Sequence, residues 1–234
     1  MKVRELTTQL GPYRATGQFQ QRPTPLGGLI IQRTWFQYWN EATIPPKFDE
    51  IVLSVDMNFG DTKSKEPSHV VGQAWGRKGV SKYLLDEIRG RWAFAESLNH
   101  IRALITKYPT MGFKLVEKKA NGAAVISALE TEFSGFVGIE PEGSKEARMY
   151  AASPGYASHC VFVPDPSMPG YEWSLEHIEE VCHFPQEPND RGDAAKPGDK
   201  LFPCTCGRVW RLAEGGEGKD GRGEKGDRHS AEFY

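Results

Sequence analysis

Cysteine and long apolar runs are both scarce in this chain. Four cysteines occur in 234 residues, at positions 160, 182, 204 and 206, and their spacing does not resemble a disulfide scaffold. This use of cysteine favours a reducing compartment. No stretch of about 18 apolar residues could cross a bilayer, and the N-terminus lacks the apolar core of a signal peptide. We therefore expect a soluble, intracellular protein that does not contact a membrane.

An excess of charge of one sign is also missing. The chain has 29 basic and 31 acidic residues, for a net charge of −2. Overall charge therefore gives no indication of nucleic-acid binding, and such a role would depend on local basic patches. No internal repeat is present either.

Several common catalytic motifs are absent. The chain contains no Gly-x-x-x-x-Gly-Lys-Ser/Thr loop for nucleotide phosphates, and nothing in it suggests a Ser-His-Asp triad. Cys204-Thr205-Cys206 could form a zinc site with Cys182, His183 or His229. Because the paired Cys-x-x-Cys spacing is missing, we disfavour that reading.

The central part of the chain alternates between strand and helix patterns. Short β-favouring runs predict strands over 51–56, 69–76, 80–86, 113–117, 136–139 and 160–164. Apolar residues at spacings of three and four predict helices over 91–108, 123–133, 144–156 and 173–184. The first three strands follow one another through short links, so they should be antiparallel. The later strand–helix alternation predicts parallel strands covered by helices. The fold class is thus α/β with a mixed sheet of five or six strands.

Composition divides the chain into three parts. Residues 1–46 are polar and rich in proline and glycine, which predicts an extended N-terminal arm, and we expect the aromatic residues of 35–39 to pack on the domain. Residues 47–195 form the predicted domain. Residues 196–234 form an atypical tail, predicted to be disordered because its end is almost entirely Gly, Glu, Lys, Asp and Arg.

Two predicted central strands end in a carboxylate. Asp56 ends the run Ile51–Val55, and Glu117 ends the run Phe113–Val116. If these strands are neighbours, the two acids emerge at the same edge of the sheet. Like charges placed so closely are unfavourable unless they are protonated or bridged by a cation.

Further acids follow the last predicted helix. Asp190 and Asp193 are three residues apart, on one face of a helical turn if that turn forms. Three carboxylates from two strand ends and a helix start can hold two Mg²⁺ or Mn²⁺ ions on a scissile phosphodiester. The alternative is that the acids are unrelated and solvated.

Four motifs, in order over residues 9–195, resemble the nuclease domain of tailed-bacteriophage terminase large subunits. The matching segments are Gln18–Pro25 with Gly27-Gly28, Trp35-Phe36 and Ser54-Val55-Asp56; Val116–Gly122, where an acid precedes Asn-Gly; Gly143–Arg148, with its Lys-x-x-Arg; and Phe184-Pro185 with Asn189–Ala194. Each motif is weak alone, but their order and spacing are specific.

The resemblance implies a ribonuclease-H-like fold and a two-metal endonuclease. Such an enzyme cuts concatemeric double-stranded viral DNA during genome packaging in the host cytoplasm. Asp56 and Glu117 match the first two catalytic acids, and Asp190 best matches the third, with Asp193 as its competitor. Lys145 and Arg148 become candidates for contact with the DNA backbone, against the simpler reading of a solvated helix face. The implied partners are a separate ATPase motor, a small terminase subunit and a portal.

The chain departs from the family pattern in two respects. It lacks the nucleotide loop of the packaging ATPase, so it would be a separate gene product, one piece of a split protein or an isolated domain. In the third motif the first aspartate is replaced by Asn189, and Gly192 with Pro197-Gly198 shortens the following helix. The tail would then be the product of a shifted reading frame.

Two alternatives remain open at this stage. One is another ribonuclease-H-like nuclease of resolvase type, which should carry a more basic surface or an added DNA-binding module. The other is a catalytically silent DNA-binding or assembly module.

Overall fold

A seven-stranded mixed sheet organises the chain in the computed structural model, which describes residues 30–58, 68–118, 122–140 and 143–185. The strand order is β1-β7-β4-β3-β2-β5-β6. The strands are β1 (Gln37–Trp39), β2 (Glu50–Asn58), β3 (Ser68–Lys78), β4 (Ser81–Trp92), β5 (Met111–Glu117), β6 (Phe136–Ile139) and β7 (Val161–Pro164). The helices are η1 (Arg33–Trp35), α2 (Phe94–Lys107), α3 (Gly122–Leu129), α4 (Lys145–Ala157) and α5 (Trp173–His183).

The pairing directions confirm the predicted fold class. β2, β3 and β4 form an antiparallel meander, and β5 then pairs parallel to β2 on its other side, followed by parallel β6. This is the mixed sheet expected of a ribonuclease-H-like fold. The hairpin between β3 and β4 turns at Gly79, whose positive φ of 57° suits a tight turn.

The sheet has one strand more than the six that the sequence predicts. The additional strand, β1, lies within the segment predicted as an arm, and it pairs with β7 at the sheet edge. The expected packing of the arm's aromatics is confirmed for Phe36 and Trp39, which are both buried. The Trp39 indole also donates a hydrogen bond of 2.9 Å to the Leu84 carbonyl.

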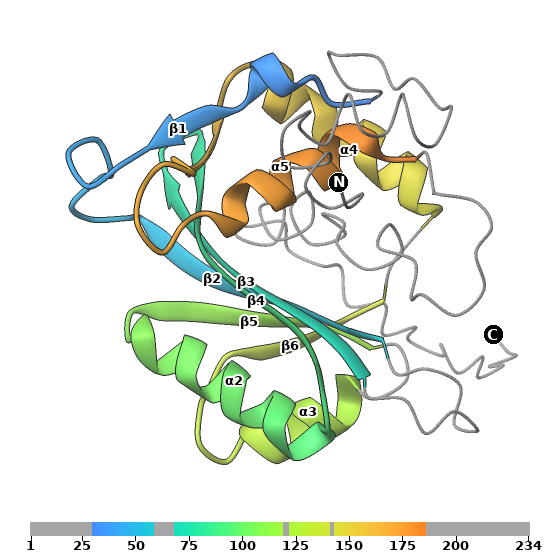
Figure 1. The fold of residues 1–234 in the computed structure, drawn as a ribbon. Helices are drawn as coiled ribbons and strands as arrows, with labels where there is room; N and C mark the ends of the chain where they lie inside the picture. Colours follow the sequence, from blue (N-terminus) through green and yellow to red (C-terminus); the bar gives the residue numbers. More distant parts are fainter. Residues whose placement is uncertain (1–29, 59–67, 119–121, 141–142, 186–234) are drawn as a thin grey trace, which may run out of the picture.

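Helices cover both faces of the sheet, so the molecule has two cores. α2 and α3 lie on one face, and α4 and α5 lie on the other (Figure 1). Leu53, Val55 and Val116 face α2 and α3, whereas Val52 and Leu115 belong to the core beneath α4 and α5. β2 is therefore apolar on both faces, as a central strand requires.

Two β-bulges interrupt the ladders. In β5 the pairing steps from Ile51–Met111 to Leu53–Lys114, so β5 has one residue more than β2. In β4 it steps from Trp75–Leu84 to Ala74–Asp86, so β4 has one residue more than β3. Each extra residue shifts the alternation of side chains between the two faces.

Of the residues described, none belongs to a helix long and apolar enough to cross a membrane. The predicted tail over 196–234 and the arm up to residue 29 lie outside the described residues, so their predicted states stay predictions.

Replacing Ile101 by alanine tests the core beneath α2. Ile101 is fully buried on α2, and removing its side-chain atoms leaves a cavity that should lower the free energy of unfolding by about 2–5 kcal/mol. Urea denaturation measures the change. The exposed neighbour Ala103 provides the control, because Ala103→Ser should stay within about 0.5 kcal/mol of the parent. Equal stabilities for the two variants would contradict the assignment of this helix face to the core.

Candidate active site

The two strand-end acids lie on neighbouring parallel strands. The last recorded pair between β2 and β5 is Val55 with Val116, so Asp56 and Glu117 each come one residue later along adjacent strands. Val55 and Val116 both face α2 and α3. Because side chains alternate across a sheet, Asp56 and Glu117 both face α4 and α5. The structure thus places together the two acids that the sequence singled out.

The two acids differ in exposure. Glu117 is 4 % exposed, whereas Asp56 is partly buried, and both interact with other groups of the chain. A buried carboxylate requires compensation by hydrogen bonds, an opposite charge or a cation. The pair therefore has the donor type and placement that a hard divalent cation requires.

The glycine of the second acidic motif is held against the backbone of Glu117. A Cβ built at Gly122 would lie 2.0 Å from the Glu117 carbonyl oxygen and 3.3 Å from Cγ1 of Val116. Only glycine fits this approach, which packs the first turn of α3 against the end of β5. The spacing between Glu117 and Gly122 thus has a direct steric cause.

The predicted basic pair lies at the start of α4. Ser144 caps this helix by accepting a hydrogen bond of 3.1 Å from the amide of Ala147. Arg148 donates to the Gly143 carbonyl at 3.0 Å, and Lys145 also has an interaction within the chain. α4 packs over the face that carries Glu117. Contact of these two residues with DNA stays a prediction.

The third predicted ligand, Asp190 or its competitor Asp193, lies outside the described residues. Of the zinc candidates, Cys204, Cys206 and His229 also lie outside them. Within the described ranges, no group of three or more His, Cys, Asp or Glu side chains could hold a metal ion. Cys182 is buried, and this burial raises the pKa of its thiol to about 11.

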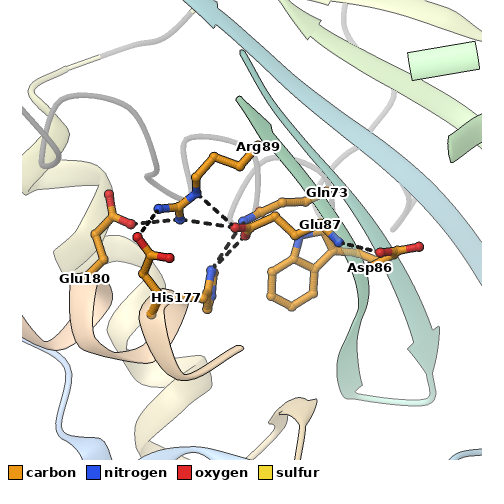
Figure 2. A network of polar contacts seen from close by, with 8 residues as sticks. Gln73, Asp86, Glu87, Arg89, His177 and Glu180 are labelled. Carbon is orange, nitrogen blue, oxygen red and sulfur yellow. Dashed lines mark hydrogen bonds and ion pairs between the residues drawn. The ribbon is translucent and has the colours of Figure 1, made fainter. Parts of the chain in front are cut away.

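A polar network that the sequence did not predict lies on the same face of the sheet (Figure 2). Glu87 of β4 is its centre, with its side chain 4 % exposed. Its carboxylate accepts hydrogen bonds from Gln73 at 2.7 Å and from Arg89 at 3.2 Å. Nδ1 of His177, on α5, lies 3.1 Å from the same carboxylate. The network therefore joins α5 to the middle of the sheet.

Arg89 connects the network to further acids of α5. Its guanidinium lies 2.9 Å from Glu180 and 3.5 Å from Glu176. Arg89 pairs across the sheet with Val71, which in turn pairs with Asp56. The network thus begins two strands away from Asp56, on the same face.

Burial and partners set the acidities of the two buried glutamates. Burial alone would raise the pKa of Glu87, but the hydrogen bond and charge of His177, with Arg89 and Gln73, hold it below its usual range. For Glu180 burial prevails over the attraction of Arg89 and raises the pKa to about 7. Glu180 therefore changes its charge near neutral pH.

A signal for this network is present in the sequence. Glu176, His177 and Glu180 occur at helical spacing, and Glu87 and Arg89 alternate along a strand. The predicted strand stopped at residue 86 because the polar residues beyond it masked the β pattern, whereas β4 continues to Trp92.

The chain was also compared with known proteins. No protein-family model and no curated protein matches it. Among solved structures, the large terminase nuclease of thermophilic phage G20c with bound magnesium is 12 % identical, with a TM-score of 0.47 over 81 % of this chain and 96 % of that one. The large terminase nuclease domain of bacteriophage SPP1 with bound Mn is 16 % identical, with a TM-score of 0.44 over 73 % and 87 %.

The large terminase of another thermophilic bacteriophage is a longer relative in structure. It is 13 % identical, with a TM-score of 0.45, and the match covers 66 % of this chain and 37 % of that one. The present chain thus spans little more than a third of that protein. The likeness to large terminases that the motifs predicted is also found among the solved structures.

Replacing Gly122 by alanine tests the contact between α3 and β5. Alanine normally stabilises a helix relative to glycine, but here its Cβ would collide with the Glu117 carbonyl. We expect a loss of about 1–3 kcal/mol in the free energy of unfolding. Gly155→Ala in α4 is the matched control, since the nearest atom to its built Cβ is 4.0 Å away. Chemical denaturation compares the two, and equal stabilities would refute the contact.

Replacing Glu180 by glutamine tests its raised pKa. A carboxyl whose pKa rises on folding, from 4.5 to about 7, binds more protons in the folded state. Its contribution to stability is present at low pH and is lost as the pH rises from about 4.5 to about 7. Glu180→Gln should therefore reduce this loss, by on the order of 1–3 kcal/mol.

The measurement is the free energy of unfolding from pH 4.5 to pH 8. Glu176→Gln is the control, because Glu176 lies one turn earlier on α5 with its side chain 74 % exposed, and it should leave the pH profile unchanged. Superimposable profiles for the parent and Glu180→Gln would refute the raised pKa.

Proposed function

We propose that this chain is the metal-dependent endonuclease of a phage large terminase, which cleaves concatemeric double-stranded DNA during genome packaging. The observation that carries the proposal is the placement of Asp56 and Glu117 at equivalent positions of two adjacent parallel strands, on one face of the sheet. The resemblance of the motifs in the sequence supports the choice of this nuclease over others of the same fold.

The described residues fit half of such a site. Asp56 and Glu117 would hold the cations, and Mg²⁺ or Mn²⁺ suits these oxygen donors. When bound, a pair of these ions activates a water and stabilises the leaving oxygen of the phosphodiester. Asp190, or else Asp193, would complete the ligand set from the segment after α5.

Burial supports a role for Glu117 beyond solvation. Its side chain is enclosed between β5 and the first turn of α3, where Gly122 touches its backbone. A metal ligand must be held within a fraction of an ångström to bind a cation well. The contact with Gly122 fixes the backbone from which this carboxylate projects.

The proposal includes partners that the resemblance implies. Double-stranded DNA would be the substrate, and an ATPase motor, a small terminase subunit and a portal would act with the chain in the host cytoplasm. A nuclease that lacks a motor loop in its own sequence would depend on another polypeptide for DNA translocation.

Removing either described acid should abolish cleavage. In a supercoiled-plasmid nicking assay with Mn²⁺, we expect Asp56→Asn and Glu117→Gln to lose activity by roughly 100-fold or more, because each removes a metal ligand. Of the two outer acids, Asp190→Asn should lose more activity than Asp193→Asn.

Glu50→Gln is the matched control. Glu50 lies on the same strand and face as Asp56 but at the opposite end, 3.7 Å from Arg77, so the variant should retain activity. Near-parental nicking by Asp56→Asn would reject the assigned site. A parent that does not nick DNA at any Mn²⁺ concentration would reject the enzyme and favour a silent DNA-binding or assembly module.

A further inference from the structure

Two arginines of β4 lie on the face of the sheet that carries the acid pair. Glu87 and Arg89 contact α5, so odd-numbered residues in this part of the strand face α5. Arg91 follows Arg89 by two residues and therefore lies on the same face. Sheet geometry thus brings two guanidinium groups to the side of Asp56 and Glu117.

The two arginines differ in what they contact. Arg89 is engaged by Glu87, Glu176 and Glu180 at distances between 2.9 and 3.5 Å (Figure 2). Its charge is fully used within the molecule. Arg91 is exposed, and it makes no hydrogen bond or ion pair with any residue in the described ranges. Its guanidinium is therefore available to a ligand from outside.

The other basic residues near this face are more committed than Arg91. Arg77 lies 3.7 Å from Glu50 at the far end of the strands, and Lys118 lies 3.7 Å from Glu140. Arg148 donates to the Gly143 carbonyl. Arg91 is thus the best placed of these cations for binding a phosphate.

The register of the sheet gives the distance from Arg91 to the acid pair. Arg91 pairs with His69, which pairs with Asn58, two residues beyond Asp56. Two strand spacings of about 4.8 Å and one two-residue step of about 6.7 Å separate the Cα atoms of Arg91 and Asp56, or roughly 12 Å in all. At 3.4 Å of rise per nucleotide, this distance spans about three or four nucleotides of one DNA strand.

We propose that Arg91 binds a backbone phosphate of the DNA about three or four nucleotides from the scissile phosphodiester, while Arg89 fastens α5 to the sheet. This inference rests on the proposed function. A guanidinium suits this task because it is always charged and presents two parallel donors to a phosphate. In a chain of net charge −2, each exposed cation on this face contributes a large share of the attraction to DNA.

Arg91→Gln should weaken DNA binding without weakening the fold. Fluorescence anisotropy with a short labelled duplex, in Ca²⁺ in place of Mn²⁺, measures the Kd over a range of salt concentrations. Loss of one phosphate contact should reduce the slope of log K against log salt by about 0.9 and weaken binding several-fold at low salt. In the nicking assay KM should rise with little change in kcat, and Tm should equal that of the parent. Arg91→Lys should restore most of the slope.

The matched control is Arg102→Gln. Arg102 lies on α2, over the opposite face, and is paired with Glu132 at 2.7 Å, so the variant removes the same charge from a distant place. If the Kd and slope of Arg91→Gln equal those of Arg102→Gln while the parent nicks DNA, the inference about Arg91 is wrong and the proposed function stands. A parent that neither binds nor nicks DNA overturns both.

Discussion

The parallel pairing of β2 with β5 is the constraint on which the candidate site depends. It sets Val55 opposite Val116, and the next residue on each strand is an acid. Both strands are apolar on the face toward α2 and α3, so the burial of these apolar residues fixes the register. The hydrophobic core therefore brings two like charges together, a cost that becomes favourable once a cation lies between them.

The opposite face of the sheet is organised by charge as well as by apolar packing. Glu87 and Arg89 take α5 onto the sheet through His177 and Glu180, and the whole network is nearly excluded from water. Breaking one member of such a network leaves its partners buried and uncompensated. The placement of α5, and of the chain that leaves it, thus depends on a set of ion pairs two strands away from the acid pair.

Much of the fold could be predicted from the sequence because apolar periodicity is strong in its central part. The six strands that were predicted and the four longer helices all occur, and Asp56 and Glu117 lie together as expected. β1 was missed because a three-residue strand has no period to detect. The polar network was missed because Glu87 and Arg89 look like a solvated strand end until α5 covers them. The outer acids, Asp190 and Asp193, follow a motif that departs from its family and lie outside the described residues.

The two β-bulges have a consequence for how this sequence can be compared with others. Met111 and Val116 face the same side of the sheet although they are five residues apart, because β5 contains one extra residue between them. With strict alternation, Glu117 would point away from Asp56. The extra residue in β4 likewise turns Arg89 and Arg91 toward α5. A relative that lacks either insertion would carry its equivalent charge one position earlier or later, so a match by residue count would assign the wrong side chain.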